Sequence, residues 1–154
     1  MKGLPPKISK ETEILILGTA PGLESLEKGE YYQDSRNRMK KILELVSEDT
    51  LKKIGFWDVF KSFKSIKESS LDKNRLFDLI NDFDKEIFEK CSKLKIIIFN
   101  GKSKGSKRLF NKFLEKYNKN LKERNINHYC LASTSGSNPY FSQKEWLDIL
   151  NRSL

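Results

Sequence analysis

Short apolar runs recur along the chain without alternating polar positions. Three of them are residues 13–17, 95–99 and 128–132, and residues 56–60 form a shorter candidate. A strand that is buried on both faces has this pattern, whereas a strand with one wet face alternates polar and apolar residues. The runs therefore predict the strands of a parallel sheet.

Between these runs the apolar positions recur three and four residues apart, which is the spacing of one helix face. The stripes are Met39, Ile42, Leu43 and Val46; Leu76, Leu79, Ile80, Phe83 and Ile87; and Leu109, Phe110, Phe113, Leu114 and Tyr117. A last helix is predicted after Ser142, because Glu145 completes a capping box ahead of Trp146. Strands that alternate with helices predict an α/β domain. The chain shows no internal repeat and no long linker, so residues 1–154 are expected to form one domain.

Composition narrows the class of protein. Of 154 residues, 11% are aromatic, which favours a folded core over disorder. The apolar runs are far shorter than the roughly 18 residues of a membrane span, and no secretory signal follows Met1, so we expect a cytoplasmic protein. Cys91, Cys130 and His128 are too few and too scattered for a zinc site or an iron–sulfur cluster. We therefore expect no metal.

Ligands of parallel α/β sheets bind where loops leave the carboxyl ends of the strands. In this chain those loops are residues 18–37, 58–72, 100–106 and 133–141. Three of them are rich in Gly, Ser, Thr and Asn, which expose backbone N–H groups and short hydroxyls. Residues 58–72 are mostly Lys, Phe and Ser. A ligand site is expected where these loops meet.

Each loop taken alone allows both a structural and a functional interpretation. Residues 18–22, Gly-Thr-Ala-Pro-Gly, lack the Walker and dinucleotide spacings and suit a tight turn. Tyr31 and Tyr32 suit stacking on a base, and Arg36 suits contact with a phosphate. Alternatively, the two tyrosines pack on the core and the arginine is solvated at a helix start. Residues 100–108 suit phosphate binding through lysines at a helix start. Residues 133–138 either hold a phosphate or form a solvated turn.

The segments are more informative in combination. They are Ile14-Leu-Ile-Leu-Gly18-Thr-Ala-Pro-Gly22, Ser25-Leu26, Tyr31-Tyr32, Arg36-Asn37, Trp57-Asp58-Val59, Ser69-Ser70-Leu71-Asp72, Phe99-Asn100-Gly101-Lys102 and Leu131-Ala132-Ser133-Thr134-Ser135. In this order and spacing, over residues 12–150, the chain resembles the uracil-DNA glycosylase superfamily. It is most similar to the deoxyinosine (hypoxanthine) glycosylase branch of that superfamily.

The resemblance implies a three-layer α/β/α fold with a short, mainly parallel central sheet that binds DNA across the strand ends. It implies a DNA glycosylase that hydrolyses the N-glycosidic bond of a deaminated or mismatched base, hypoxanthine or uracil, in base excision repair. The superfamily uses no metal or organic cofactor for this chemistry. The expected partner is double-stranded DNA containing a damaged base. We expect a monomer located in the cytoplasm at the nucleoid.

The resemblance also implies roles for individual residues. Asn37 would orient the attacking water, because an amide is not a strong base, and Thr19 offers a hydroxyl where other branches carry Asp or Asn. Tyr31 or Tyr32 would stack on the flipped base, and Asp58 would read its edge. The remaining residues of the expected base pocket are Gly18, Ala20, Pro21, Gly22 and Asn100. Those expected to approach the nucleotide and its phosphate are Ser133, Thr134 and Ser135.

The chain departs from the branch at three places. Asp34-Ser35 stands where His-Pro is usual, Met39-Lys40 where Phe-Trp is usual, and Gly136 where proline is expected. A glycosylase-like module that binds DNA without cleaving it is therefore an alternative. A second alternative is an enzyme of the same fold class that acts on a small nucleotide, although one nucleotide does not need so many basic residues. Hypoxanthine, uracil and xanthine all stay open as the base.

The net charge of +9 indicates an acidic partner. Residues 101–125 contain nine Lys and Arg against two Glu, which is +7 of that total. Lys102, Lys104 and Lys107 follow the loop at Asn100, so these three and Arg36 are the expected phosphate contacts. The lysines further along the run suit a solvated helix face equally well.

Overall fold

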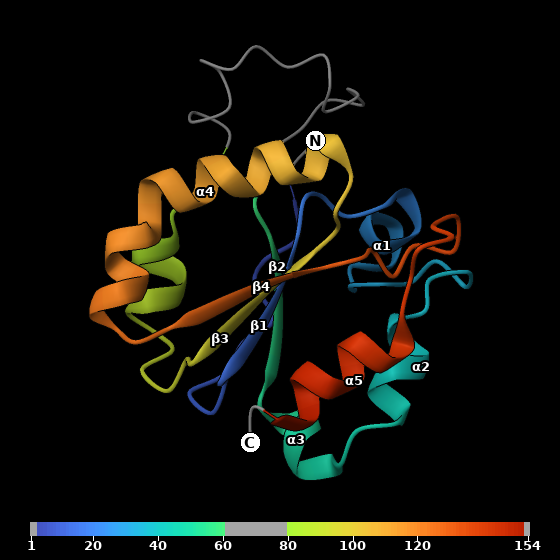
Figure 1. The fold of residues 1–154 in the computed structure, drawn as a ribbon, viewed down its shortest axis with the longest axis horizontal. Coiled ribbons are helices and arrows are strands. Elements are labelled where there is room, and N and C mark those ends of the chain that lie inside the picture. Colours follow the sequence, from blue (N-terminus) through green and yellow to red (C-terminus); the bar gives the residue numbers. More distant parts are fainter. Residues whose placement is uncertain (1–2, 61–79, 153–154) are drawn as a thin grey trace.

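A parallel sheet lies at the centre of the computed structural model, which describes residues 3–60 and 80–152 (Figure 1). The strand order is β2-β1-β3-β4, and every pair is parallel. The strands are β1 (Ile14–Gly18), β2 (Ile54–Asp58), β3 (Ile96–Asn100) and β4 (Asn127–Leu131). The predicted parallel sheet is confirmed. The second strand was predicted two residues too late, and its true bounds place Asp58 at its carboxyl end.

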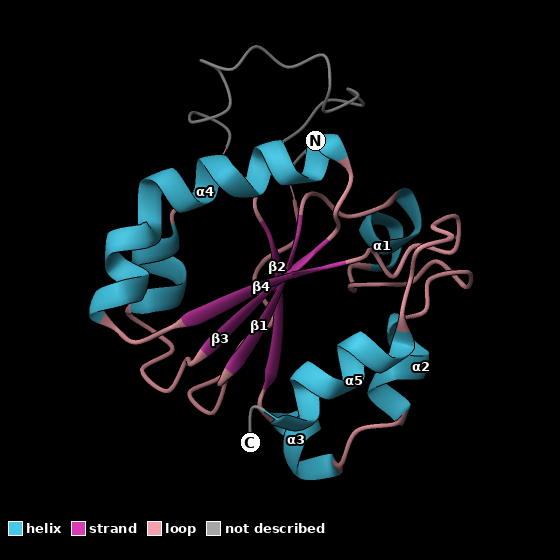
Figure 2. Ribbon diagram, in the orientation of Figure 1, coloured by secondary structure: helices cyan, strands magenta, loops and turns pink. Residues whose placement is uncertain are grey.

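Helices cover both faces of this sheet (Figure 2). They are α1 (Leu23–Lys28), α2 (Met39–Glu44), α3 (Glu48–Lys52), the π-helical turn η3 (Asp84–Phe88), α4 (Lys104–Glu123) and α5 (Gln143–Arg152). Leu15 and Leu17 of β1 point into a core that includes residues of η3 and α4. Ile14 and Ile16 point into a second core with residues of α2 and α5. The three-layer α/β/α architecture is therefore confirmed.

The two longer helices begin where the sequence predicts. Ser103 caps α4, because its Oγ accepts a hydrogen bond from the N–H of Ser106 at 3.2 Å. Ser142 precedes α5, and its Oγ accepts from the N–H of Glu145 at 3.3 Å. The predicted stripe of α4 faces the core, with Phe113 fully buried. Hydroxyl caps satisfy N–H groups that a helix start would otherwise leave unpaired.

The sequence did not predict the short helices α1 and α3. In α1 the apolar residues are few, and the Gly22 cap makes no side-chain hydrogen bond, so neither periodicity nor a cap marks the helix. The predicted helix is wrong at Ile80, because Ile80 instead pairs with Phe60 in an antiparallel bridge. Leu76, Leu79 and the segment from Ser69 to Asp72 lie outside the described residues.

Parallel pairing brings the carboxyl ends of the strands to one edge. Gly18 pairs with Asp58, and Asn100 pairs with Leu131, directly before the loop at Ser133. Segments that are far apart in the sequence therefore meet at this edge. In the part of the chain that the structure describes, no helix combines the length and apolar character needed to cross a membrane.

Candidate active site

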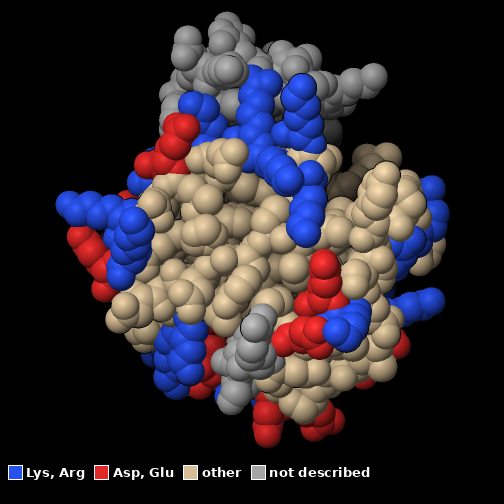
Figure 3. Space-filling model, viewed as in Figure 1, with Lys and Arg blue, Asp and Glu red and all other residues tan. Residues whose placement is uncertain are grey.

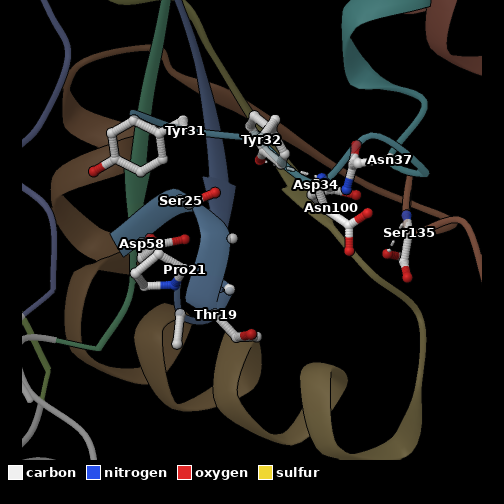
Figure 4. Close-up of a pocket in the computed structure, with 14 residues that line it drawn as sticks. Thr19, Pro21, Ser25, Tyr31, Tyr32, Asp34, Asn37, Asp58, Asn100 and Ser135 are labelled. Carbon is white, nitrogen blue, oxygen red and sulfur yellow. Dashed lines mark hydrogen bonds between the residues drawn. The ribbon is translucent and has the colours of Figure 1, made fainter. Parts of the chain in front are cut away.

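A cavity of about 270 Å³ opens at the carboxyl edge of the sheet (Figure 4). It is lined by Gly18, Thr19, Ala20, Pro21, Gly22, Ser25, Tyr31, Tyr32, Asp34, Asn37, Asp58, Asn100, Ser133 and Ser135. All of these except Ser25 and Asp34 are site residues predicted from the sequence. The predicted catalytic residues and base-pocket residues therefore come together in one place.

Gly18 and Asp58 sit at the strand ends of the cavity. The carboxylate of Asp58, a residue only 5% exposed, lies directly against the Cα of Gly18. A Cβ added to Gly18 would lie 2.5 Å from Oδ1 of Asp58, which is closer than atoms can pack. Glycine at this position therefore lets a carboxylate lie across the end of the neighbouring strand.

Tyr31 and Tyr32 line the cavity with their hydroxyls already placed. Tyr31 donates to the carbonyl of Pro5 at 2.8 Å, and its ring stacks on Phe56 with the centroids 6.1 Å apart. The hydroxyl of Tyr32 accepts a hydrogen bond from Asn100 Nδ2 at 3.2 Å. Burial raises the pKa of both phenols well above the usual value, and the charge of Asp58 adds to this effect. Both hydroxyls therefore stay protonated.

Asn100 ties three segments together. Its Nδ2 donates to Tyr32 and to Oγ1 of Thr134 at 3.0 Å, and its Oδ1 accepts from the N–H of Thr134 at 3.1 Å. Both amide hydrogens are therefore used inside the protein. Thr134 is fully buried, so its side chain faces the protein, and the expected approach of this residue to a phosphate remains a prediction. Thr134 anchors the loop, and Ser133 and Ser135 face the cavity.

Asn37 lies just before α2, on the side of the cavity that also carries Asn100 and Ser135, across from Asp58 (Figure 4). Its Oδ1 accepts a hydrogen bond from the N–H of Met39 at 2.9 Å, which satisfies a free donor at the helix start. Because Oδ1 faces the helix, Nδ2 is the end of the amide left for a ligand or a water (Figure 4). Asn37 thus offers the cavity mainly a hydrogen-bond donor.

Asp34 lies on the same wall as Asn37. The N–H of Asn37 donates to the carbonyl of Asp34 at 2.9 Å, so one turn carries both side chains. Arg36 donates to both carboxylate oxygens, from NH2 to Oδ2 at 2.9 Å and from its backbone N–H to Oδ1 at 2.9 Å. These hydrogen bonds lower the pKa of Asp34 to about 2. The predicted phosphate contact Arg36 is 80% exposed at its side chain, but does not line the cavity.

The turn at residues 34–38 packs against the loop at residues 133–138. Arg38 donates from its guanidinium to the carbonyl of Asn138 at 2.9 Å and from its backbone N–H to Thr134 at 2.9 Å. A Cβ on Gly136 would lie 2.5 Å from the carbonyl oxygen of Arg36. Gly136, where the family pattern has proline, therefore permits this turn and this loop to approach each other.

Lys102, Lys104 and Lys107 are exposed and do not line the cavity. They lie at the start of α4, two to seven residues beyond Asn100, and Figure 3 shows basic side chains gathered over the first turns of this helix. Their position suits contact with a long anion that passes the cavity, since phosphates follow one another along a strand.

Two lining residues were missed by the sequence interpretation. Ser25 is buried, and its Oγ accepts from the N–H of Gln33 at 3.1 Å, so it holds the turn before Asp34. Asp34 was noted only as a departure from the family pattern. Its spacing of three residues from Asn37 was the available signal. Within residues 3–60 and 80–152, no three His, Cys, Asp or Glu side chains gather as they would around a metal ion.

Comparisons with known proteins agree with this geometry. The family model of the uracil DNA glycosylase superfamily matches residues 5–154. The chain belongs to this superfamily. A hypoxanthine DNA glycosylase of Methanosarcina acetivorans is 32% identical, with 94% of each chain covered. A hypoxanthine DNA glycosylase of Methanosarcina barkeri is 34% identical, covering 89% of this chain and 87% of the relative.

A solved structure of the superfamily shows the same fold. The solution NMR structure of a candidate uracil DNA glycosylase from Methanosarcina acetivorans superposes with a TM-score of 0.68 at 29% identity, covering 99% of this chain and 97% of the other. The family and branch predicted from the sequence are confirmed at this level. The individual residue roles remain predictions.

Proposed function

We propose that the protein is a DNA glycosylase that removes a deaminated base, with hypoxanthine as the first candidate. The observation that carries the proposal is the cavity at the sheet edge, which gathers Asn37, Tyr32 and Asp58 with the loops at residues 18–22 and 133–135. The relatives named hypoxanthine DNA glycosylases support the choice of base. The partner would be double-stranded DNA, bound by a monomer in the cytoplasm at the nucleoid.

The size and lining of the cavity support one flipped base as its occupant. Its volume of about 270 Å³ lies just below the roughly 300 Å³ at which pockets for drug-sized ligands begin. A base inside a duplex cannot be reached, so the nucleotide has to leave the stack before the bond breaks. The Tyr31 ring beside Asp58 and Ser25 would contact the base (Figure 4).

Asp58 would select a base by its edge. A carboxylate only accepts hydrogen bonds, so it favours a ring N–H. Hypoxanthine at N1 and uracil at N3 each carry such a hydrogen, whereas adenine and cytosine carry an acceptor at the corresponding ring nitrogen. Deamination therefore replaces a ring acceptor, which the carboxylate of Asp58 repels, with a ring N–H that can donate a hydrogen bond to it. This difference supports excision of hypoxanthine and uracil and rejection of adenine and cytosine, from which they form.

The reaction would break the bond between C1′ and the ring nitrogen, with the electron pair leaving on the base. Donors aimed at the cavity would stabilise this developing anion, and the hydroxyl of Tyr32 remains protonated for that task. Asn37 would hold the water that adds to C1′ through its Nδ2, and Thr19 supplies a hydroxyl nearby. The proton that this water loses would finally reside on the base.

Phosphates would be held outside the cavity. Ser133 and Ser135 line its mouth, and beyond it Lys102 lies just before α4 while Lys104 and Lys107 lie in the first turns of this helix. Arg36 adds an exposed guanidinium on the turn that packs against the loop at residues 133–138. Such contacts position a strand without reading its sequence.

Incubation with duplexes that each carry one uracil, hypoxanthine or xanthine, followed by alkali, tests this proposal. We expect strand breaks at the damaged base, strongest with hypoxanthine, and none in a duplex with only normal bases. Binding of all duplexes without any strand break would instead support the alternative of a DNA-binding module. Neither binding nor cleavage would contradict both.

A further inference from the structure

The wall that carries Asn37 also carries a carboxylate with no role in the reaction as described above. Asp34 lines the cavity, and its side chain is 39% exposed. Asp58 is 5% exposed and lies at the strand ends. The cavity thus contains one carboxylate at its floor and one at its mouth.

The two positions face different parts of a flipped nucleotide. The base enters the cavity deepest, because it is the only part of the nucleotide that does not belong to the sugar–phosphate backbone of the DNA. The sugar remains attached to two phosphates and has to stay at the mouth. Asp34 is therefore on the level of the sugar, beside Ser135 and Asn37 (Figure 4).

We propose that Asp34 is a catalytic residue that stabilises the cationic sugar and accepts a hydrogen bond from the attacking water. This proposal rests on the proposed function. When the bond to C1′ breaks, positive charge develops on C1′ and the ring oxygen while the base leaves with the electron pair. A fixed negative charge at the mouth is the complement of that cation. The water then adds to C1′, its proton passes through solvent to the base, and Asp34 ends the cycle unchanged.

Asp34 and Asn37 complement each other in holding this water. Asn37 directs its Oδ1 to Met39, so it presents a donor. A carboxylate presents only acceptors. A water between them would receive a hydrogen bond from the amide and donate one to Asp34, which leaves its second lone pair for C1′.

Arg36 fixes the carboxylate in this orientation. Arg36 donates from Nη2 to Oδ2 of Asp34 at 2.9 Å and from Nε to Oδ1 at 3.2 Å. The same contacts lower the pKa of Asp34, so the carboxylate, already charged at neutral pH, keeps its charge further into the acid range. Arg36 is thereby a positioning residue, acting on the sugar through Asp34.

The test compares three carboxylates by variants that remove one negative charge each. Asp34→Asn and Asp58→Asn change the mouth and the floor. Glu24→Gln is the matched control, because the charge of Glu24 also acts on Arg36 but its side chain is exposed and does not line the cavity. Affinity is measured for two duplexes that cannot be cleaved, one with a neutral tetrahydrofuran abasic site and one with a cationic pyrrolidine in its place.

We expect the native protein and Glu24→Gln to prefer the cationic duplex. Asp34→Asn should lose most of this preference and release base about 10²-fold more slowly, the scale for one preorganised electrostatic contact. The same variant should also bind the neutral duplex slightly more tightly, because it no longer carries the negative charge of Asp34, which repels the phosphates of the DNA. A purely structural role would weaken binding to both duplexes alike and leave the ratio unchanged.

The outcomes separate this proposal from the proposed function. If the native protein releases base and Asp34→Asn does so equally fast, or keeps the cationic preference, Asp34 has no such role. If the preference disappears in Asp58→Asn and not in Asp34→Asn, the floor carboxylate stabilises the sugar instead. If the native protein releases no base from any duplex, the proposed function itself fails, and the role of Asp34 fails with it.

Discussion

Each end of the sheet carries a buried carboxylate, Glu13 at the amino end and Asp58 at the carboxyl end, and the surroundings of the two differ. At the amino end, Glu13 is 8% exposed and pairs with Lys95 at 2.5 Å and Lys53 at 3.3 Å. These lysines precede β3 and β2, so the ion pairs tie β1, β2 and β3 together at their starts. At the carboxyl end, Asp58 and Asp34 line an open cavity.

We infer that the charge of Glu13 stabilises the fold and that the carboxylates of the cavity would serve the reaction. The hydrogen bond from Lys95, followed by that from Lys53, lowers the pKa of Glu13 and satisfies its charge within the protein. The carboxyl end instead leaves polar groups around a space that a ligand can enter. Replacement of a residue at the amino end should therefore cost stability, and replacement at the carboxyl end should cost activity.

The largest effect is expected for Asn37. In Asn37→Ser the hydroxyl can still accept from the N–H of Met39, but the amide donor is lost, so base release should fall about 10²- to 10³-fold in single-turnover kinetics. Duplex affinity and thermal stability should stay close to native. Asn37→Ala should show the same loss of rate and, in addition, weaken the start of α2 by about 0.5–2 kcal/mol.

Asn111→Ala, which removes an exposed amide on α4, is the control for Asn37 and should leave the rate unchanged. Equal rates for native protein and Asn37→Ser would refute the role of Asn37. Equal rates would also mean that a replacement at the carboxyl end of the sheet does not cost activity, which removes the expected difference between the two ends.

The second effect concerns the two ends of α4, which runs from the cavity edge toward the opposite end. Replacing Lys102, Lys104 and Lys107 by Gln should flatten the salt dependence of duplex binding by a slope of about 2.7, at about 0.9 for each phosphate contact. From about 50 to about 200 mM salt the native protein would then lose about 40-fold more affinity than the variant.

The matched control removes the same charge further along the helix. Replacing Lys116, Lys119 and Lys122, all exposed, by Gln should leave the salt slope as it is in the native protein. If both triple variants flatten the slope equally, binding follows net charge alone, and the start of α4 is not a distinct DNA contact.

The smallest effect is expected for Glu13→Gln, which should lower the free energy of unfolding by about 1–2 kcal/mol at neutral pH. A buried carboxylate gains more from charged hydrogen bonds than an exposed one, but both lysines are substantially exposed, which reduces the gain. Chemical denaturation measures this difference, and base release below the melting range should be unaffected.

The pH dependence of Glu13→Gln follows from the lowered pKa. The folded state binds the proton less readily than the unfolded state, so the stabilisation is present above the ordinary value of 4.5 and is lost as pH falls through the lower folded pKa. The gap between native and variant stability should therefore shrink on acidification. A gap that is constant from neutral pH to pH values well below 4.5 would mean that the ion pairs contribute nothing.

Much of the fold was predictable because its strands are buried on both faces. Uninterrupted apolar runs mark β1 and β3, and the periodic face of α4 and the Ser142 cap mark the helices. The short helices α1 and α3 were not predictable, since five or six residues hardly show a period. The shift of β2 arose because Ile54 and Gly55 were not recognised as part of the run.

The site was predictable as a set of residues but not as a set of contacts. Parallel topology brings the strand ends together, so the loops at Gly18, Asp58, Asn100 and Ser133 had to meet. Burial of Thr134 and the use of both amide hydrogens of Asn100 depend on side-chain packing, which no spacing reveals. The pairing of Asp34 with Arg36 is a local turn that the departure from the family pattern obscured.

Release of free base from a duplex with one deoxyinosine, followed side by side for native protein, Glu13→Gln and Asn37→Ser, separates a catalytic carboxyl end of the sheet from a structural amino end. We predict that native protein and Glu13→Gln release hypoxanthine at the same rate at a temperature where both are folded, and that Asn37→Ser binds the duplex and leaves the base attached. Equal release by all three proteins, or no release of hypoxanthine, uracil or xanthine by the native protein, would contradict this separation.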